Sequence, residues 1–133
     1  MTVKEAFPFN KIRGVRLAAV ASGLKKDSLD LALIELNENC VCSAVFTQSS
    51  FAAAPVLISR EHLKDESSRY ILVNSGNANA ATGNEGFENA IRCCESVAEM
   101  AGLKKEAVLP FSTGVIGEPL NYQKIQNAIP SLF

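Results

Sequence analysis

The chain has 133 residues, of which 47% are hydrophobic and 20% are charged, and this composition is that of a folded globular domain rather than a disordered segment. Thirteen basic and fourteen acidic residues leave a net charge of -1, so no broad basic surface predicts binding to nucleic acid or to an anionic membrane. We therefore expect small molecules or proteins as partners.

No apolar run is long enough to cross a membrane, and residues 1–14 carry mixed charges in place of the apolar core of a signal peptide. The sequence therefore predicts a cytoplasmic protein. The four cysteines form two close pairs, Cys40 with Cys42 and Cys93 with Cys94, and neither pair has the spacing of a zinc site. We expect reduced and mostly buried thiols, with no metal and no bound cofactor.

Three apolar runs near the start of the chain predict β-strands. The first follows Gly14 and ends at a Ser-Gly turn. The next two, residues 30–37 and residues 40–47, both have the length of a strand, and only a Glu-Asn pair separates them. We expect these two runs to form a hairpin in which Asn39 adopts the left-handed turn conformation.

The middle of the chain predicts two further strands. Residues 55–59 have the composition of a strand, with Pro55 at its first position, where proline is tolerated. A helical turn near residues 60–63 and a polar linker are expected to follow. Residues 70–73 form the next predicted strand, which leads into a stretch rich in glycine and asparagine.

The clearest helix in the sequence follows this stretch. Apolar residues recur at three- and four-residue spacing between Phe87 and Ala101, while charged residues take the other face. Either Thr82 or Asn84 can act as the N-cap of this helix. Gly102 lies where a glycine commonly ends one.

Residues 74–86, between the strand and this helix, contain three glycines and four asparagines. Glycine lets a backbone approach a ligand closely, and asparagine both donates and accepts hydrogen bonds. The stretch is therefore either the wall of a binding site or a long loop tied by its own asparagines, and composition does not separate the two. It lacks the spacing of a dinucleotide fingerprint and the Gly-Lys-Ser/Thr of a phosphate-binding loop.

Residues 108–120 predict a second junction of the same kind. A short strand from Val108 to Phe111 leads into a Ser112-Thr113-Gly114 corner, and a helix begins beyond Pro119. Such a corner can direct backbone N–H groups and a hydroxyl to one point, which suits an oxyanion that develops during acyl transfer. An ordinary turn has the same composition, so the corner alone does not decide the matter.

The last predicted element is a short helix from about Asn121 to Ile129, ended by Pro130. The apolar end at Phe133 predicts that the natural fold continues. Several strands, one long helix and one short helix indicate an α/β or α+β fold with a mixed sheet. We treat residues 1–133 as a single domain.

Four segments carry a family resemblance. They are GVRLAAVASGLKK near the start, AVFTQSSFAAAPV, ILVNSGNANAATGNEG and VLPFSTGVIGEPL. On these residues, which follow the family's order across nearly the whole chain, the sequence resembles the ArgJ family of arginine biosynthesis. This family is also known as bifunctional ornithine acetyltransferase or glutamate N-acetyltransferase.

The resemblance implies covalent acyl transfer. Members of the family cleave themselves before a threonine, giving an α chain and a β chain whose new N-terminal threonine is the nucleophile. The acetyl group of N-acetylornithine passes to that threonine and then to glutamate. The family's oxyanion residues correspond to Thr113, through its hydroxyl, and Gly114, through its backbone N–H. The substrate-site wall is predicted at Asn74, Gly76, Asn77, Asn79, Thr82 and Gly83.

The resemblance also implies a layered sandwich with helices outside and sheets within, and an α/β heterotetramer. No bound cofactor is implied, although some members use acetyl-CoA as an additional donor. The chain stops before the family's self-cleavage site, so we expect the N-terminal part of an α chain that lacks its C-terminal end, the whole β chain and activity of its own. Its Ala81-Thr82 step is expected to shape the loop and the helix start rather than to be cleaved.

Two other interpretations remain. The chain could be a truncated descendant that folds and self-associates but catalyses nothing, because it has no nucleophile and ends on apolar residues. The reading frame downstream of Phe133 separates this interpretation from the enzyme. A cysteine hydrolase built on Cys42 or Cys93 is disfavoured, because its base would have to be His62, the single histidine, which lies in a polar segment.

Overall fold

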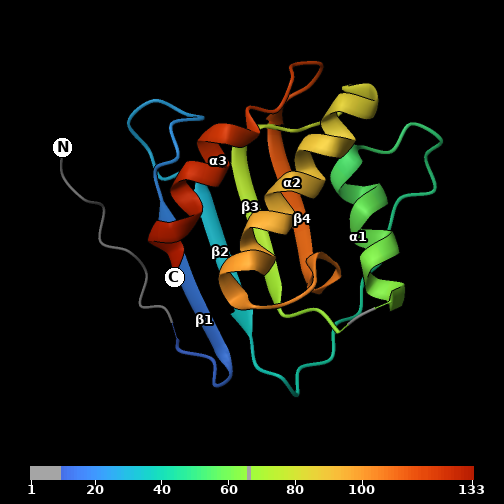
Figure 1. Ribbon diagram of the computed structural model, residues 1–133. Coiled ribbons are helices and arrows are strands. Elements are labelled where there is room, and N and C mark those ends of the chain that lie inside the picture. Colours follow the sequence, from blue (N-terminus) through green and yellow to red (C-terminus); the bar gives the residue numbers. More distant parts are fainter. Residues whose placement is uncertain (1–9, 66) are drawn as a thin grey trace.

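A four-stranded mixed sheet organises the fold in the computed structural model, which describes residues 10–65 and 67–133 (Figure 1). The strands are β1 (Val15–Val20), β2 (Leu31–Leu36), β3 (Tyr70–Asn77) and β4 (Val108–Val115), in the sheet order β1-β2-β3-β4. β2 is antiparallel to both of its neighbours, whereas β4 runs parallel to β3. The parallel pair requires a crossover connection, and a long helix provides it.

Among the described residues, three α-helices cover one face of this sheet. They are α1 (Ala54–Asp65), α2 (Gly83–Ala101) and α3 (Tyr122–Ala128), and short 3-10 turns precede β4 (Lys105–Ala107) and end the chain (Ile129–Leu132). Figure 1 shows α2 in front of the sheet, between α3 and α1. The core lies between sheet and helices and includes Leu31, Leu33, Leu72, Val108, Ile58, Val97 and Ile125. The α+β class with a mixed sheet and helices outside it is confirmed.

The opposite face of the sheet is apolar and open. Directly paired residues share a face, so Leu17, Ile34 and Ile71 lie together on this side, and Val73 lies beside Phe111. Leu17 is 50% exposed and Phe111 is 47% exposed. Within the described residues, the helices therefore leave this face uncovered.

The predicted helix ends agree with the structure. Gly102 ends α2 in the left-handed conformation, with a φ of 67°. Thr82 is the N-cap residue of α2 by position, although its side chain makes no capping hydrogen bond. Asn121 caps α3, since its side-chain oxygen accepts a hydrogen bond from Lys124 N at 3.2 Å. Pro130 lies in the 3-10 turn that follows α3.

The predicted hairpin between residues 30–37 and 40–47 is wrong. β2 pairs with β1 on one side and β3 on the other, and residues 40–47 form no strand. Val45 is 99% exposed. Asn39 does not take the left-handed conformation, and its N–H donates to the Asn37 side-chain oxygen at 3.3 Å. Residues 40–47 cannot form a hairpin with β2, because both edges of β2 are already paired.

The strand predicted at residues 55–59 is also wrong, because these residues lie within α1. Pro55 occupies the first turn of the helix, where a missing N–H has no intrahelical partner to lose. Buried positions recur at helical spacing along α1, but two of them, Ser59 and His62, are polar. The pattern of hydrophobic residues alone therefore does not reveal the helical period of α1. The helical turn expected next is the second half of α1.

Replacement of Ile58 tests how α1 packs. Ile58 is 1% exposed, whereas its neighbour Leu57 is 39% exposed. We expect Ile58→Ala to lower the free energy of unfolding by about 2–5 kcal/mol, because the change leaves a cavity. Leu57→Ala should lower it by less than about 1 kcal/mol. Urea unfolding followed by circular dichroism measures both values, and equal small losses would contradict this packing.

Candidate functional site

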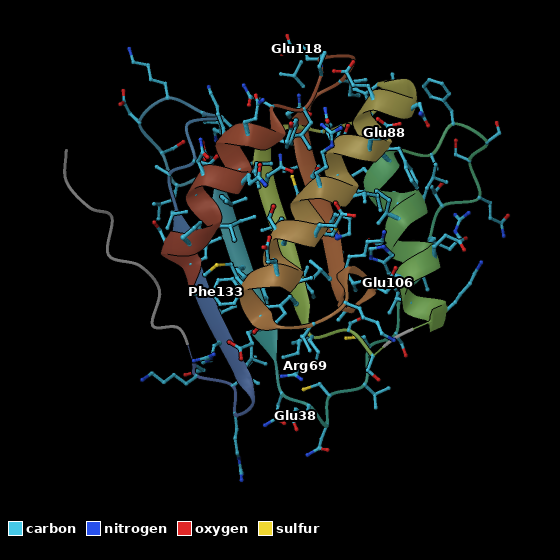
Figure 2. The ribbon with its side chains drawn as sticks, in the orientation of Figure 1. Glu38, Arg69, Glu88, Glu106, Glu118 and Phe133 are labelled. Atoms are coloured by element: carbon cyan, nitrogen blue, oxygen red, sulfur yellow. The ribbon has the colours of Figure 1, made fainter. Side chains whose placement is uncertain are left out.

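The two glycine-rich stretches meet where β3 and β4 end. Residues 74–76 of β3 pair one to one with residues 112–114 of β4. This end of the parallel pair lies at the top of the sheet in Figure 1, and Glu118 marks the loop after β4 in Figure 2. The parallel pairing therefore brings together the two stretches that the sequence singles out.

The predicted corner at Ser112-Thr113-Gly114 is part of a strand. β4 continues through Val115, and the next helix begins only at Tyr122. Similarly, the first four residues of the stretch 74–86 belong to β3, so the loop before α2 is residues 78–82. Both strands continue through a glycine because Gly76 and Gly114 pair with each other. Either glycine would weaken a strand that had no such partner.

One edge of β4 faces β3. The carbonyl of Ala107, just before the strand, accepts a hydrogen bond from Arg69 N, and that of Val115 accepts one from Ala78 N, both at 2.8 Å. Backbone polar groups alternate sides along a strand, so every second residue from 107 to 115 faces β3. The residues between them, including Ser112 and Gly114, turn their backbone N–H groups to the outer edge.

Helix α1 covers the first half of this outer edge. His62 Nδ1 donates to Val108 O at 2.7 Å, and Ser59 Oγ donates to Pro110 O at 3.1 Å; both side chains are buried. The sequence alone reveals neither contact, although Ser59 and His62 stand three residues apart on one face of α1. Gly114 lies beyond the covered half and is exposed, and by the alternation along β4 its N–H points away from β3.

The Thr113 side chain lies on the open face of the sheet. It shares this face with Phe111, two residues earlier, whereas Ser112 between them points to the helix side. Thr113 is exposed. A hydroxyl and a backbone N–H from adjacent residues thus stand at the uncovered end of β4, which is a donor pair suited to a developing negative charge.

Gly114 occupies a position that only glycine fits. Its φ is 135°, in the region that favours glycine. A Cβ added there would lie 2.5 Å from Asn77 N and 2.7 Å from Gly76 O. The backbones of β3 and β4 therefore touch directly, and any side chain at residue 114 would push the strands apart.

Two of the predicted wall residues, Asn74 and Asn77, have buried amides that bond within the chain. Asn74 Oδ1 accepts from Ser112 Oγ at 2.6 Å, and Asn74 Nδ2 donates to Asn77 O at 2.9 Å. Asn77 Nδ2 donates to the carbonyls of Glu118 and Pro119 at 3.0 and 3.3 Å. These amides hold β4 and its following loop against β3.

Asn79, a third wall residue, is 0% exposed and fixes the start of α2. Its N–H donates to Asn77 Oδ1 at 2.7 Å, its Nδ2 to Gly86 O at 2.8 Å, and its Oδ1 accepts from Thr82 Oγ1 at 2.8 Å. The contacts of the three asparagines favour the tied-loop interpretation for their side chains. Their role in a substrate wall stays a prediction.

The remaining wall residues lie at different places. Gly76 is opposite Gly114 and packs against Lys25, whose Cγ would be 2.7 Å from an added Cβ. Thr82 and Gly83 instead line a hollow of about 310 Å³ at the start of α2, together with Ser50, Phe51, Ala52, Ala54, Leu57, Ala81, Asn84 and Phe87. The structure brings Gly76 to the donor pair, and it places Thr82 and Gly83 in this separate hollow.

The described cysteines are all free thiols. Cys93 and Cys94 are buried in the core, and burial raises the pKa of the Cys93 thiol to about 12 and also raises the pKa of Cys94. Both thiols are therefore protonated at neutral pH, which makes them poor nucleophiles. Cys40 and Cys42 are partly exposed.

Residues 10–65 and 67–133 contain no group of three or more histidine, cysteine, aspartate and glutamate side chains that could hold a metal ion. None of the helices in this part of the chain is long and apolar enough to span a membrane.

These features define an α+β chain with a mixed sheet that presents a hydroxyl and a backbone donor from one edge strand. The family model of ArgJ matches residues 16–133, and the chain belongs to this family. The resemblance found in the sequence is thereby confirmed.

Curated relatives of the chain are named arginine biosynthesis bifunctional protein ArgJ. That of Methylococcus capsulatus is 50% identical over 92% of this chain and 30% of its own length. That of Neisseria meningitidis is 43% identical over 99% of this chain and 33% of its own length. The chain thus spans about a third of these relatives.

Two solved structures have the same fold. The ArgJ protein of Bacillus halodurans superposes with a TM-score of 0.83, at 33% identity over 88% of this chain and 62% of that chain. An ornithine acetyltransferase of Mycobacterium tuberculosis, solved in complex with ornithine, gives the same TM-score at 34% identity, over 90% of this chain and 65% of that chain.

Alanine at Gly114 tests the close contact of the two backbones. We expect Gly114→Ala to lower the melting temperature strongly or to prevent folding, because the new Cβ collides with the β3 backbone. Gly117→Ala is the matched control: Gly117 also has a positive φ, of 81°, but nothing lies within 4 Å of an added Cβ. The control should lower the free energy of unfolding by only about 1 kcal/mol. Thermal unfolding compares the two, and equal losses would contradict the contact.

Thiol labelling tests the burial of the cysteines. At pH 8, we expect iodoacetamide to alkylate Cys40 and Cys42 in the native chain and to leave Cys93 and Cys94 unmodified, because these two are buried and stay protonated. All four should react in denaturant. Mass spectrometry of peptides identifies the labelled sites, and rapid native labelling of Cys93 would contradict this arrangement.

Proposed function

We propose that this chain is the N-terminal, α-chain part of an acetyltransferase of arginine biosynthesis, which transfers the acetyl group of N-acetylornithine to glutamate. Its own contribution is the oxyanion hole, formed by the Thr113 hydroxyl and the Gly114 N–H. The observation that carries the proposal is the exposed donor pair on the uncovered half of β4. Membership of the ArgJ family and the ornithine bound to the mycobacterial relative support it.

The proposed chemistry needs these donors twice. A threonine nucleophile attacks the acetyl carbonyl of N-acetylornithine, and the carbonyl oxygen becomes an oxyanion that accepts hydrogen bonds from Thr113 and Gly114. The intermediate collapses, the amine of ornithine leaves with a proton, and the acetyl group stays on the enzyme. The amino group of glutamate then attacks the acetyl ester, and the same donors stabilise the second oxyanion.

In this proposal the nucleophile belongs to a β chain of the same precursor, and the two chains assemble as an α/β heterotetramer in the cytoplasm. The enzyme holds no bound cofactor, and acetyl-CoA acts at most as a second acetyl donor. Since the chain spans about a third of its curated relatives, its activity is best assayed with the remaining part of a relative attached.

A chimera provides the test. Residues 16–133 replace the matching segment of the Methylococcus capsulatus relative, which is 50% identical. We expect the chimera to release ornithine from N-acetylornithine when glutamate is present, and the 133-residue chain alone to release none. In the chimera, Thr113→Ala should lower kcat about a hundredfold, because one oxyanion donor is lost. Thr113→Ser keeps the hydroxyl and should stay within about tenfold of the parent.

Thr47→Ala serves as the matched control. Thr47 is an exposed threonine whose hydroxyl oxygen accepts a hydrogen bond from Ser49 N within a loop, so its loss should leave kcat unchanged. A loss below about threefold for Thr113→Ala would remove Thr113 from the oxyanion role. A folded but inactive chimera would favour the non-catalytic descendant, and turnover by the isolated chain would contradict the proposed division of the site.

A further inference from the structure

A buried asparagine of β3 holds the start of the segment that carries the two donors. Ser112 Oγ, immediately before Thr113, donates to Asn74 Oδ1 at 2.6 Å. Asn74 is 4% exposed, and its Nδ2 donates to Asn77 O at 2.9 Å. The β3–β4 register shifts at Asn77. One amide therefore connects β4 to the irregular point of β3.

Asn77 holds the far end of the same segment. Its Nδ2 donates to the carbonyls of Glu118 and Pro119, and the residue is 7% exposed. Its Oδ1 accepts the N–H of Asn79 at 2.7 Å, which fixes the amide's orientation. Figure 2 shows Glu118 at the tip of the loop, beyond the end of the sheet.

Between these two contacts, residues 113–115 still pair with β3, but the segment beyond Val115 is no longer part of the sheet. Residues 113–117 are all exposed, and Gly114 has no side chain. Beyond the strand pairing, backbone hydrogen bonds run from Ala78 N to Val115 O and from Gly117 N to Ala80 O, both at 2.8 Å. Their partners belong to the loop that Asn77 and Asn79 shape. The direction of the Gly114 N–H thus depends on its pairing with β3 and on the backbone path that the asparagines shape on both sides of it.

We propose that Asn74, acting through the Ser112 hydroxyl, is a positioning residue for the oxyanion donors Thr113 and Gly114. This inference rests on the function proposed above. The bond between Ser112 and Asn74 sets the rotation of β4 at the residue before the donors. Without it, residues 113 and 114 turn relative to the substrate. A misaligned donor gives a weaker hydrogen bond. This costs most in the transition state, where the oxyanion forms, and least in the ground state.

The test uses the chimera described above. Ser112→Ala should lower kcat by about ten- to a hundredfold, as a small misplacement of catalytic groups does, with KM within about twofold of the parent. Ser112→Thr keeps the hydroxyl and should recover most of the rate. Asn74→Asp keeps the acceptor for Ser112 but removes the donor to Asn77 O, so its kcat should also fall. If that variant does not fold, the Ser112 pair still decides the question.

Ser59→Ala is the matched control. Like Ser112, Ser59 is a serine whose hydroxyl donates a hydrogen bond that holds β4 in place. Its acceptor is Pro110 O, which precedes Thr113 and Gly114 in the strand. The Ser59→Ala variant should lower the melting temperature as Ser112→Ala does, while its kcat stays within about threefold of the parent. A purely structural role for Ser112 would give the two variants the same rate.

A double variant completes the test. If Ser112 acts through the donors, Ser112→Ala should slow the Thr113→Ala enzyme by a smaller factor than it slows the parent. Fully multiplicative losses, or a normal kcat for Ser112→Ala beside a hundredfold loss for Thr113→Ala, would overturn the positioning role and leave the proposed function intact. A normal kcat for Thr113→Ala would overturn the proposed function itself.

Discussion

The direct contact between the backbone of Gly114 and that of Gly76-Asn77 is the constraint on which the site depends. A side chain at residue 114 would collide with the β3 backbone, and Gly76 and Gly114 both have positive φ values, of 102° and 135°. The contact sets where β3 and β4 stop being an ordinary parallel pair. Everything beyond it, including the loop before α2, follows a path fixed by buried amides rather than by regular strand pairing.

The helices support this arrangement from one side. α2 returns the chain from the end of β3 to the start of β4, which makes the parallel pair possible. α1 then binds the outer edge of β4 through two polar side chains, Ser59 and His62, that would each be costly to bury without a partner. The sheet's other face stays apolar and open, and Thr113 stands on it with Phe111. Thr113 and Gly114 thus lie at the boundary between a packed and an uncovered surface.

The sequence predicted those parts of the fold that local patterns encode. The period of α2, its glycine end and the start of α3 near Asn121 depend on neighbouring residues only, and the structure confirms all three. Residues 40–47 were mistaken for a strand because the sequence does not reveal that β2 already has two partners. Residues 55–59 were mistaken for one because Ser59 and His62 interrupt the apolar stripe of α1. The proposed roles of Thr113 and Gly114 come from the family resemblance and stay a prediction, whereas the contact of Ser112 with Asn74 joins residues far apart in sequence and is seen only in the register of β3 and β4.

The way α1 binds β4 also bears on self-association. The unpaired backbone groups of an exposed edge strand can pair with a strand of a second molecule and so extend the sheet. Along β4 this is blocked at its start, because Pro110 has no N–H and the carbonyls of Val108 and Pro110 already accept hydrogen bonds. The outward backbone groups that remain, at Ser112 and Gly114, form too short a ladder to hold a strand. This edge of the sheet therefore resists extension by a second molecule without being covered along its whole length.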